Sequence, residues 1–295
     1  MGLNFLKNIK INYNVGKKTW FGSGGNCLLF CEAENVEQLK FLFKIVPKKY
    51  PLFILGLGSN IIFRDGFYKG VVIKLGKEFK NISHNKEILK VGCGVKDFDL
   101  ANYCLENSIT NFEFLIGIPG TIGGGLRMNS SCYGSCISEN LRSIKVLDDK
   151  RKILIMKKED ILFNYRENTL PKKFIFLEAE FFIKFKKKNF IKRKMDEIKK
   201  MRKKTQPIGV RTGGSTFKNP KNLRAWEIIE KVGLRDKIVG GAKVSNKHSN
   251  FIINFQNASS LDLEILGEEI KKVVNEKTGV KLLWEIERIG DFEKF

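Results

Sequence analysis

Gly56-Leu57-Gly58-Ser59-Asn60 and Ile118-Pro119-Gly120-Thr121-Ile122-Gly123-Gly124-Gly125 are the two stretches that decide how this chain folds. Glycine has no Cβ, so its backbone can take positive φ, and successive N–H groups can converge on an anion. The second stretch has no charged side chain, and its glycines cost more conformational entropy than a plain connection needs. Both stretches therefore predict a phosphate-containing nucleotide cofactor.

The first stretch lies between two predicted strands. Residues 35–46 have apolar side chains at helical spacing and end before Pro47, which predicts a helix. Short apolar runs at 52–55 and 61–63 predict strands on either side of the glycines. A doubly wound dinucleotide fold needs a helix directly after its glycines, so that fold is excluded. A tight hairpin between the two strands is the alternative that needs no ligand.

Length and composition limit the possible classes of protein. A chain of 295 residues predicts two domains. No apolar run approaches the roughly 18 residues of a membrane span, and residues 1–6 match neither a secretory leader nor a myristoylation site, which predicts a cytoplasmic protein. We expect the six cysteines to be reduced and packed as small apolar groups. Their spacing, with only two histidines in the chain, predicts no metal site.

The chain is strongly basic. It has 54 Lys and Arg against 32 Asp and Glu, a net charge of +22, which invites a nucleic-acid interpretation. The lysines are scattered, however, and the densest run, residues 184–204, contains a predicted helix at 192–203 whose basic face can simply be solvated. No helix-turn-helix, zinc-finger or aromatic RNA-binding pattern accompanies it. We therefore expect no nucleic-acid partner and keep that function as a remote alternative.

Three short segments carry candidate chemistry. Arg166, beside Tyr165, can clamp a carboxylate or phosphate with two hydrogen bonds, or form a surface salt bridge. Ser215 follows two glycines and precedes Lys218, so its hydroxyl is a candidate nucleophile, proton donor or turn former; no hydrolase motif surrounds it. Glu285 lies in a strand-like run near the C-terminus and either faces a pocket or is solvated.

The C-terminal third predicts a small α+β domain. An apolar helical stripe at 225–232 is followed by a loop at 240–250 and a strand at 251–254. A second helix is expected from Ser259 or Ser260 to Gly279. Strands at both ends complete the alternation between residues 214 and 290.

In this order the motifs resemble the UDP-N-acetylenolpyruvoylglucosamine reductase family. The resemblance covers nearly the whole chain from Thr19 onward. The matching segments are residues 56–60 and 118–124, Asn164-Tyr165-Arg166, Gly214-Ser215-Thr216-Phe217-Lys218-Asn219-Pro220, Gly241-Ala242-Lys243-Val244-Ser245 and Glu285-Ile286-Glu287-Arg288-Ile289-Gly290. Ser23 departs from the Ile or Val common in the family, and the short segment 174–204 leaves no room for an extra substrate-capping segment, so the chain resembles the shorter subgroup.

The resemblance implies an α+β fold with two domains. Residues 1–204 would form an FAD-binding domain of the vanillyl-alcohol-oxidase type, with subdomains of about 1–78 and 79–204, and residues 205–295 a substrate-binding domain. It also implies a monomeric FAD enzyme of peptidoglycan precursor synthesis. In that reaction NADPH is the hydride donor, and the enolpyruvyl ether of UDP-N-acetylglucosamine-enolpyruvate becomes the lactyl ether of UDP-N-acetylmuramate. Another flavin oxidoreductase of the same fold is the alternative.

The resemblance also implies roles for individual residues. Ser215 would donate a proton, and Arg166 and Glu285 would stabilise the intermediate, whose negative charge spreads into a carboxylate. Lys218 is a candidate cation to stabilise the serine alkoxide. Substrate contacts would come from Tyr165, Lys218 and Asn219. FAD contacts would come from Gly56, Leu57, Gly58, Ser59, Asn60, Ile118, Pro119, Gly120, Thr121, Gly123 and Gly124.

Overall fold

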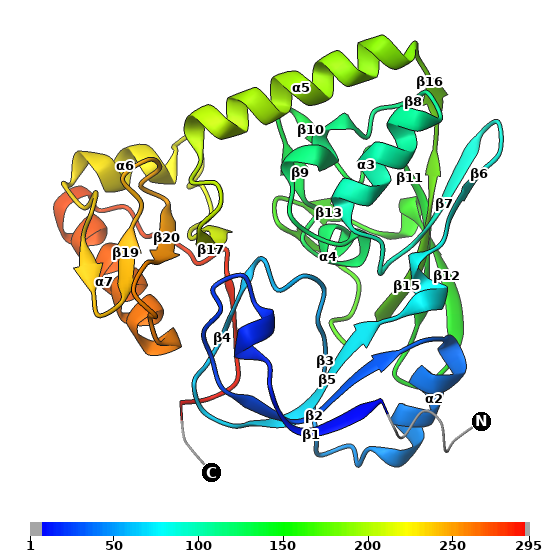
Figure 1. Cartoon of the computed structure of the whole chain (residues 1–295), viewed down its shortest axis with the longest axis horizontal. Helices are drawn as coiled ribbons and strands as arrows, with labels where there is room; N and C mark the ends of the chain where they lie inside the picture. Colours follow the sequence, from blue (N-terminus) through cyan, green and yellow to red (C-terminus); the bar gives the residue numbers. More distant parts are fainter. Residues whose placement is uncertain (1–7, 293–295) are drawn as a thin grey trace. The chain divides into compact units, whose positions relative to one another are not determined.

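The computed structural model describes residues 8–292, which form two compact units (Figure 1). Among the described residues, unit 1 contains 8–10, 31–57 and 71–202. Unit 2 contains 11–30, 58–70 and 203–292. The division into functional domains at 1–204 and 205–295 remains a prediction, and the interpretation of residues 1–6 lies outside the described residues.

The centre of unit 1 is a five-stranded antiparallel sheet. Its strand order is β12 (Ile153–Lys157), β11 (Leu141–Leu147), β15 (Ile175–Phe182), β7 (Ile88–Gly92) and β6 (Ile82–His84). Alternate side chains of β15, namely Leu177, Ala179 and Phe181, are buried, as expected when one face of a strand lies on a core. The short helix α4 (Ile122–Arg127), formed by the second glycine stretch, packs against β15 and β7.

Unit 1 also contains the helix predicted at 35–46. α2 spans Val36–Ile45, and Asn35 caps it by accepting a hydrogen bond from Gln38 N at 2.9 Å. β3 (Leu52–Ile54) then pairs in parallel with β5 (Tyr68–Leu75). β1 (Ile9–Asn14) and β2 (Asn26–Ala33), most of whose residues belong to unit 2, are neighbouring strands.

Shorter elements complete unit 1. α3 spans Asp97–Glu106, and α5, which begins four residues before the predicted Lys192, spans Lys188–Thr205 and buries Ile191, Met195 and Ile198. The two-residue strands are β8 (Ile109–Thr110), β9 (Ser131–Cys132), β10 (Ser135–Cys136), β13 (Phe163–Asn164), β14 (Glu167–Asn168) and β16 (Lys184–Phe185). The 3-10 helices are η1 (Gly16–Lys18), which belongs to unit 2, and η2 (Lys77–Lys80), η3 (Glu113–Gly117) and η4 (Lys158–Asp160).

Unit 2 contains the predicted C-terminal α+β arrangement. Its antiparallel sheet has the order β17 (Arg211–Ser215), β20 (Phe251–Asn254), β19 (Ala242–Val244) and β18 (Ile238–Val239). α6 (Ala225–Lys231) and α7 (Ser260–Thr278) pack over a core that includes Phe217 and Leu266. Ser259 forms a capping box with Asp262, and Gly279 ends α7 at φ +71°, as its sequence signals predict.

The first glycine stretch joins strands of different sheets. β3 pairs with β5, whereas β4 (Ile61–Phe63) pairs in parallel with the C-terminal strand β21 (Glu287–Ile289). The hairpin alternative for residues 56–60 is therefore wrong. The pairing of β4 with β21 brings residues that are more than 220 positions apart in sequence onto adjacent strands, and it sets the position of Asn60 relative to Glu285.

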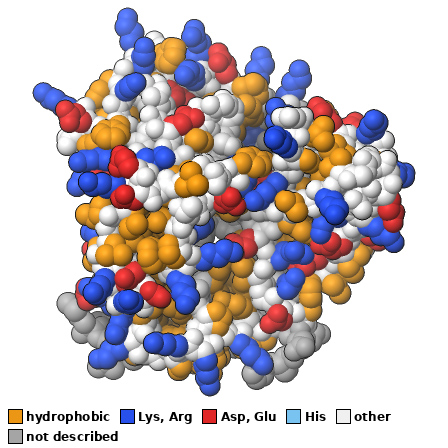
Figure 2. Space-filling model, turned by 180° about the vertical axis from the view of Figure 1, so that it is seen from behind, with side chains coloured by type: hydrophobic (Ala, Val, Ile, Leu, Met, Phe, Trp, Pro, Cys, Tyr) orange, Lys and Arg blue, Asp and Glu red, His pale blue; other side chains and the backbone are white. Residues whose placement is uncertain are grey.

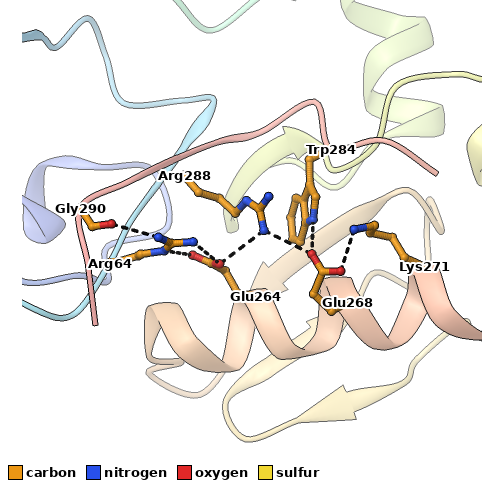
Figure 3. A network of polar contacts seen from close by, with 7 residues as sticks. All are labelled: Arg64, Glu264, Glu268, Lys271, Trp284, Arg288 and Gly290. Atoms are coloured by element: carbon orange, nitrogen blue, oxygen red, sulfur yellow. Dashed lines mark hydrogen bonds and ion pairs between the residues drawn. The ribbon is translucent and has the colours of Figure 1, made fainter. Parts of the chain in front are cut away.

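A polar network holds β4, α7 and β21 together inside unit 2 (Figure 3). Arg64 donates from Nε and Nη2 to the two carboxylate oxygens of Glu264 at 2.8 and 3.0 Å, and from Nη1 to Gly290 O at 3.0 Å. Glu268 accepts hydrogen bonds from Trp284 Nε1 at 2.7 Å, Arg288 Nη1 at 3.2 Å and Lys271 Nζ at 2.6 Å. The buried Glu264 carboxylate is therefore fully paired.

The described residues also bear on three expectations from the sequence, which concern membrane spans, metal sites and the state of the cysteines. None of the helices within residues 8–292 combines the length and apolar character that crossing a bilayer requires. The same residues contain no group of His, Cys, Asp and Glu side chains arranged to hold a metal ion. All six cysteines fall in this range; none forms a disulfide, and four of them are buried.

Candidate active site

The first glycine stretch needs its glycines for steric reasons. Gly58 has φ +66°, and a Cβ there would lie 2.9 Å from Thr19 Cα. Its carbonyl accepts a hydrogen bond from Trp20 N at 2.9 Å. A Cβ on Gly56 would lie 2.8 Å from Thr121 Oγ1, so within unit 1 the first stretch touches the second. Larger residues at either position would force the backbone apart.

The second stretch uses its N–H groups differently from the sequence interpretation. The amides of Ile122 and Gly123 donate to Val95 O and Cys93 O, both at 2.9 Å. Those of Gly124 and Gly125 donate to Thr121 itself, to Oγ1 at 3.3 Å and to O at 2.8 Å. These four donors hold the loop to its own unit, so the expectation that successive N–H groups of this segment converge on an anion is wrong for residues 122–125. Their glycines permit close packing instead.

One face of the second stretch remains open to a ligand. Gly124 is exposed, and the position of a Cβ there meets only Thr121 Oγ1, at 3.5 Å. Just beyond it, Asn129 Oδ1 is buried without a hydrogen-bond partner in the described part of the chain. Bare backbone next to an unsatisfied polar atom is what a tightly held cofactor requires. These residues therefore fit the FAD that the resemblance implies.

A residue that the sequence analysis missed lies behind the same stretch. Asp97, the first residue of α3, is fully buried, and its backbone N donates to Gly120 O at 3.0 Å. Burial raises the pKa of its carboxyl group to about 8. An acidic residue in the first turn of a helix is ordinary, so no sequence signal could have identified this burial.

Arg166 occupies the turn of the β13–β14 hairpin, at φ +62°. Its Nη1 donates to Ser131 Oγ at 2.8 Å, and its guanidinium lies over the Tyr165 ring at 4.8 Å. The hairpin is also tied to the segment after the second glycine stretch, because Asn129 Nδ2 donates to Asn164 O at 3.0 Å. Tyr165 and Arg166 are therefore held beside the residues that follow the second glycine stretch in unit 1.

Ser215 ends strand β17 in unit 2. It follows Gly214, which has φ +81°, and Ser59 O lies 4.0 Å from the position of a Cβ on Gly214. The next peptide is fixed by Thr216 N, which donates to Asn250 O at 2.7 Å. Asn250 is another residue that the sequence analysis missed: its side chain bonds both N and O of Phe217, at 3.0 and 2.8 Å.

Glu285 is positioned beside this strand. Its N donates to Thr216 O at 2.9 Å, and its O accepts from Asn60 Nδ2 at 3.2 Å. Phe217 and Trp284 form an antiparallel bridge next to it. Unit 2 therefore brings together the second half of the first glycine stretch, the serine and the C-terminal glutamate.

Lys218 and Asn219, the two predicted substrate residues that follow Ser215, both make hydrogen bonds to other parts of unit 2. Lys218 N donates to Leu283 O at 2.8 Å. Asn219 Oδ1 accepts from Ala225 N at 3.0 Å, at the start of α6, so this oxygen is already engaged in the fold. Both residues are half-buried, and their roles toward a substrate remain predictions.

The predicted site residues therefore fall into two groups. Unit 1 carries Gly56, Leu57, residues 118–124, Tyr165 and Arg166. Unit 2 carries residues 58–60, Ser215, Lys218, Asn219 and Glu285. The cofactor segments and the candidate proton donor are each supported by a hydrogen-bonded framework of their own unit.

Two protein-family models match parts of this chain. Residues 28–156 match the model of an FAD-binding domain, and residues 206–289 match the C-terminal domain of UDP-N-acetylenolpyruvoylglucosamine reductase. The reductase of that name from Rickettsia conorii is 46% identical over 281 residues, 95% of each chain. The one from Rickettsia typhi is 46% identical over 283 residues, 96% of each chain.

A solved structure gives the same result for the fold. The crystal structure of UDP-N-acetylenolpyruvylglucosamine reductase from Thermus caldophilus matches with a TM-score of 0.85 and 28% identity, covering 96% of this chain and 100% of that one. The predicted α+β fold, an FAD-binding domain followed by a small C-terminal domain, is confirmed. With an identity of 46% over 95% of its length, the chain belongs to the UDP-N-acetylenolpyruvoylglucosamine reductase family.

Proposed function

We propose that this chain is an FAD-dependent oxidoreductase that uses NADPH to reduce the enolpyruvyl ether of UDP-N-acetylglucosamine-enolpyruvate to UDP-N-acetylmuramate, a peptidoglycan precursor. The observation that carries the proposal is the family membership over 95% of the chain, together with an intact framework around Ser215 and Glu285. We further propose that residues 1–204 hold the cofactor and residues 205–295 cover the substrate. Both matched domain models fall within these limits.

We propose that the two glycine stretches hold FAD, through residues 56–60 and through Ile118, Pro119, Gly120, Thr121, Gly123 and Gly124. The steric requirement at Gly56 and Gly58 and the open face of Gly124 support this assignment. Bound FAD would supply the two-electron chemistry, accepting hydride from NADPH and passing it to the substrate. The protein supplies binding, orientation and electrostatics.

The catalytic residues of the proposal are Arg166, Ser215 and Glu285. Addition of hydride to the vinyl group leaves negative charge that spreads into the adjacent carboxylate of the substrate, and a guanidinium such as Arg166 stabilises that charge. Ser215 Oγ would deliver the proton to the neighbouring carbon. Glu285 would hydrogen-bond to the developing enediolate or orient the cation.

Tyr165, Lys218 and Asn219 would contact the substrate. Lys218 follows Ser215 by three residues, and its ammonium group would stabilise the serine alkoxide during proton delivery. Tyr165 is exposed and stacks with Arg166, so it can present its ring to a sugar or nucleotide. Asn219 Oδ1 accepts a hydrogen bond from Ala225 N at the start of α6, which fixes the position of this side chain after Lys218.

We propose a monomer that acts in the cytoplasm without a nucleic-acid partner. Figure 2 shows Lys and Arg side chains spread over the whole of the visible face, with Asp and Glu side chains among them. A distributed charge of this kind differs from the concentrated basic stripe typical of nucleic-acid binding.

The proposed function is tested with the purified protein in its yellow form. NADPH alone should bleach the flavin absorbance, and addition of UDP-N-acetylglucosamine-enolpyruvate without oxygen should restore it with one product formed per flavin. Restoration by oxygen or by an alcohol-derived carbonyl, but not by the UDP-sugar, would favour another flavin oxidoreductase of this fold. A colourless protein that takes up no FAD would contradict the proposal.

A further inference from the structure

A buried carboxyl group lies directly behind the second glycine stretch. Asp97 begins α3 and is 0% exposed. Its backbone N donates to Gly120 O at 3.0 Å, and its neighbour Lys96 forms an antiparallel bridge with Thr121. The first turn of α3 and the glycine stretch are thus joined through their main chains, and the Asp97 side chain projects into the space between them.

The carboxyl group occupies space that the glycines leave free. Asp97 Oδ2 lies 2.5 Å from the position of a Cβ on Gly120, and Oδ1 lies 3.9 Å from the corresponding position on Gly125. Ser130 Oγ lies 2.9 Å from that same position on Gly125. The side chains of Asp97 and Ser130 therefore pack directly against the stretch at Gly120 and Gly125.

None of these oxygen atoms is satisfied. Within the described residues, Asp97 Oδ1, Asp97 Oδ2 and Ser130 Oγ are buried and have no hydrogen-bond partner. An isolated carboxylate in such a place is very costly, whereas a neutral carboxylic acid is tolerated. Burial alone accounts for the raised pKa of about 8, so the acid stays protonated at neutral pH.

The other charged and titratable groups around Asp97 do not pair with its carboxyl group. On its own helix, Lys96 and Asp99 are exposed. On α4, Arg127 is engaged with Leu170 O at 3.1 Å and Phe174 O at 2.7 Å. On the segment after β7, burial raises the pKa of the Cys93 thiol, which keeps it neutral. A proton lost from this cluster in mildly alkaline solution therefore comes from Asp97.

We infer that neutral Asp97 is a positioning residue for the FAD-binding stretch 118–125, and that its ionisation displaces this stretch and weakens FAD binding. The ionised carboxylate would have to reach solvent, and because its oxygens pack against Gly120 and Gly125, its movement displaces these residues. Residues 122–125 donate all four of their amides within unit 1, so such a movement changes the loop as a whole. The inference rests on the proposed function in taking FAD as the ligand.

The test is the dissociation constant of FAD, measured by flavin fluorescence on the full-length apoprotein across the range from about pH 6 to about pH 10. If only the neutral form binds, the dissociation constant of the wild type rises by up to about tenfold per pH unit above the pKa of Asp97. Asp97→Asn keeps the shape but cannot ionise, so its affinity should stay constant over this range. Asp99→Asn, which changes an exposed carboxylate two residues away, should keep the wild-type profile.

The outcomes separate this inference from the proposed function. FAD binding with the same pH profile in the wild type and in Asp97→Asn would overturn the inference and leave the reductase function intact. Failure to bind FAD at any pH would instead overturn the proposed function.

If Asp97→Asn does not fold, hydrogen exchange on the wild-type protein decides the question. The amides of residues 122–125 should lose protection above about pH 8, beyond the intrinsic rise of exchange with pH, while those of α7 should not. If the amides of residues 122–125 lose no more protection than those of α7, the inference is wrong.

Discussion

Two buried carboxyl groups in this molecule are treated in opposite ways. Glu264, in unit 2, receives both donors of the Arg64 fork at 2.8 and 3.0 Å and has Arg288 at 3.6 Å (Figure 3). Asp97, in unit 1, is fully buried with neither oxygen paired. The chain therefore pairs one buried carboxyl group with two guanidinium groups and buries the other without a partner.

The different treatment of Glu264 and Asp97 matches the different structural role of each region. Glu264 joins α7 to the β4–β21 strands, a framework that holds Asn60 and Glu285 in fixed register, and bidentate charged hydrogen bonds give such a framework definite geometry. Asp97 packs against a loop that we propose binds the cofactor, and a neutral acid there can ionise as the pH rises. Substitutions in the two regions should therefore differ in the size and the pH dependence of their effects.

Arg64→Ala should have the largest effect, because it leaves the Glu264 carboxylate buried with only the more distant Arg288. Removing one partner of a buried pair costs about 3 kcal/mol or more of unfolding free energy. Chemical denaturation followed by tryptophan fluorescence measures it. A loss below about 0.5 kcal/mol, the range of an exposed ion pair, would show that Glu264 is not effectively buried.

Asp97→Asn should stabilise the protein in a pH-dependent way. The folded-state pKa of about 8 lies above the ordinary value of 3.8, so the stability that Asp97 contributes is full below about pH 3.8 and falls as pH rises toward 8. Relative to the wild type, the variant should therefore gain about 2 kcal/mol between pH 6 and pH 8, with at most about 1.4 kcal/mol per pH unit. Thermal unfolding at several pH values measures this gain. If the difference in stability between Asp97→Asn and the wild type does not change with pH, as we expect for the control Asp99→Asn, Asp97 is not neutral in the folded protein.

Trp284→Phe should have a smaller effect, about 1 kcal/mol, because it removes the hydrogen bond from the indole Nε1 to Glu268 while keeping most of the aromatic packing against Phe217. Urea denaturation measures the loss. Comparison with Glu268→Gln, which can still accept the indole hydrogen bond, separates that bond from the charge of Glu268. If the Gln variant is the less stable of the two, the charge matters more than the bond.

Lys271→Ala should have the smallest effect, within about 0.5 kcal/mol, because the Lys271–Glu268 pair is one helical turn apart and both groups are partly solvated. Thermal unfolding at low and high salt checks this. A loss as large as that of Arg64→Ala would show that the network of Figure 3 acts as a single unit, not as one buried pair with an exposed margin.

The sequence predicted most successfully where the signal is local. The helix at 35–46 and the helix from Ser259 to Gly279 were predicted because each has apolar side chains at helical spacing and a local signal at either end, with Pro47 after the first and Gly279 after the second. The order of the motifs predicted the family, which the comparisons confirm.

Contacts between distant segments could not be predicted in this way. Arg64 and Glu264 are 200 residues apart, and Asn60 and Glu285 are 225 residues apart, so no local pattern records their pairing. The burial of Asp97 depends on a loop more than 20 residues downstream that happens to lack side chains. For the same reason the amides of residues 122–125 were assigned to an anion, although Val95, Cys93 and Thr121 accept them.

We propose that the glycine stretches hold the cofactor, whereas the framework of Ser215 and Glu285 delivers the proton to the substrate; rapid-mixing kinetics on Ser215→Ala separate these two roles. NADPH should reduce the bound flavin of the variant at nearly the wild-type rate, while reoxidation by UDP-N-acetylglucosamine-enolpyruvate should slow by about 10²-fold to 10⁴-fold. Ser83→Ala, at an exposed serine of β6, should leave both steps unchanged. Reoxidation of Ser215→Ala at the wild-type rate would show that Ser215 is not the proton donor.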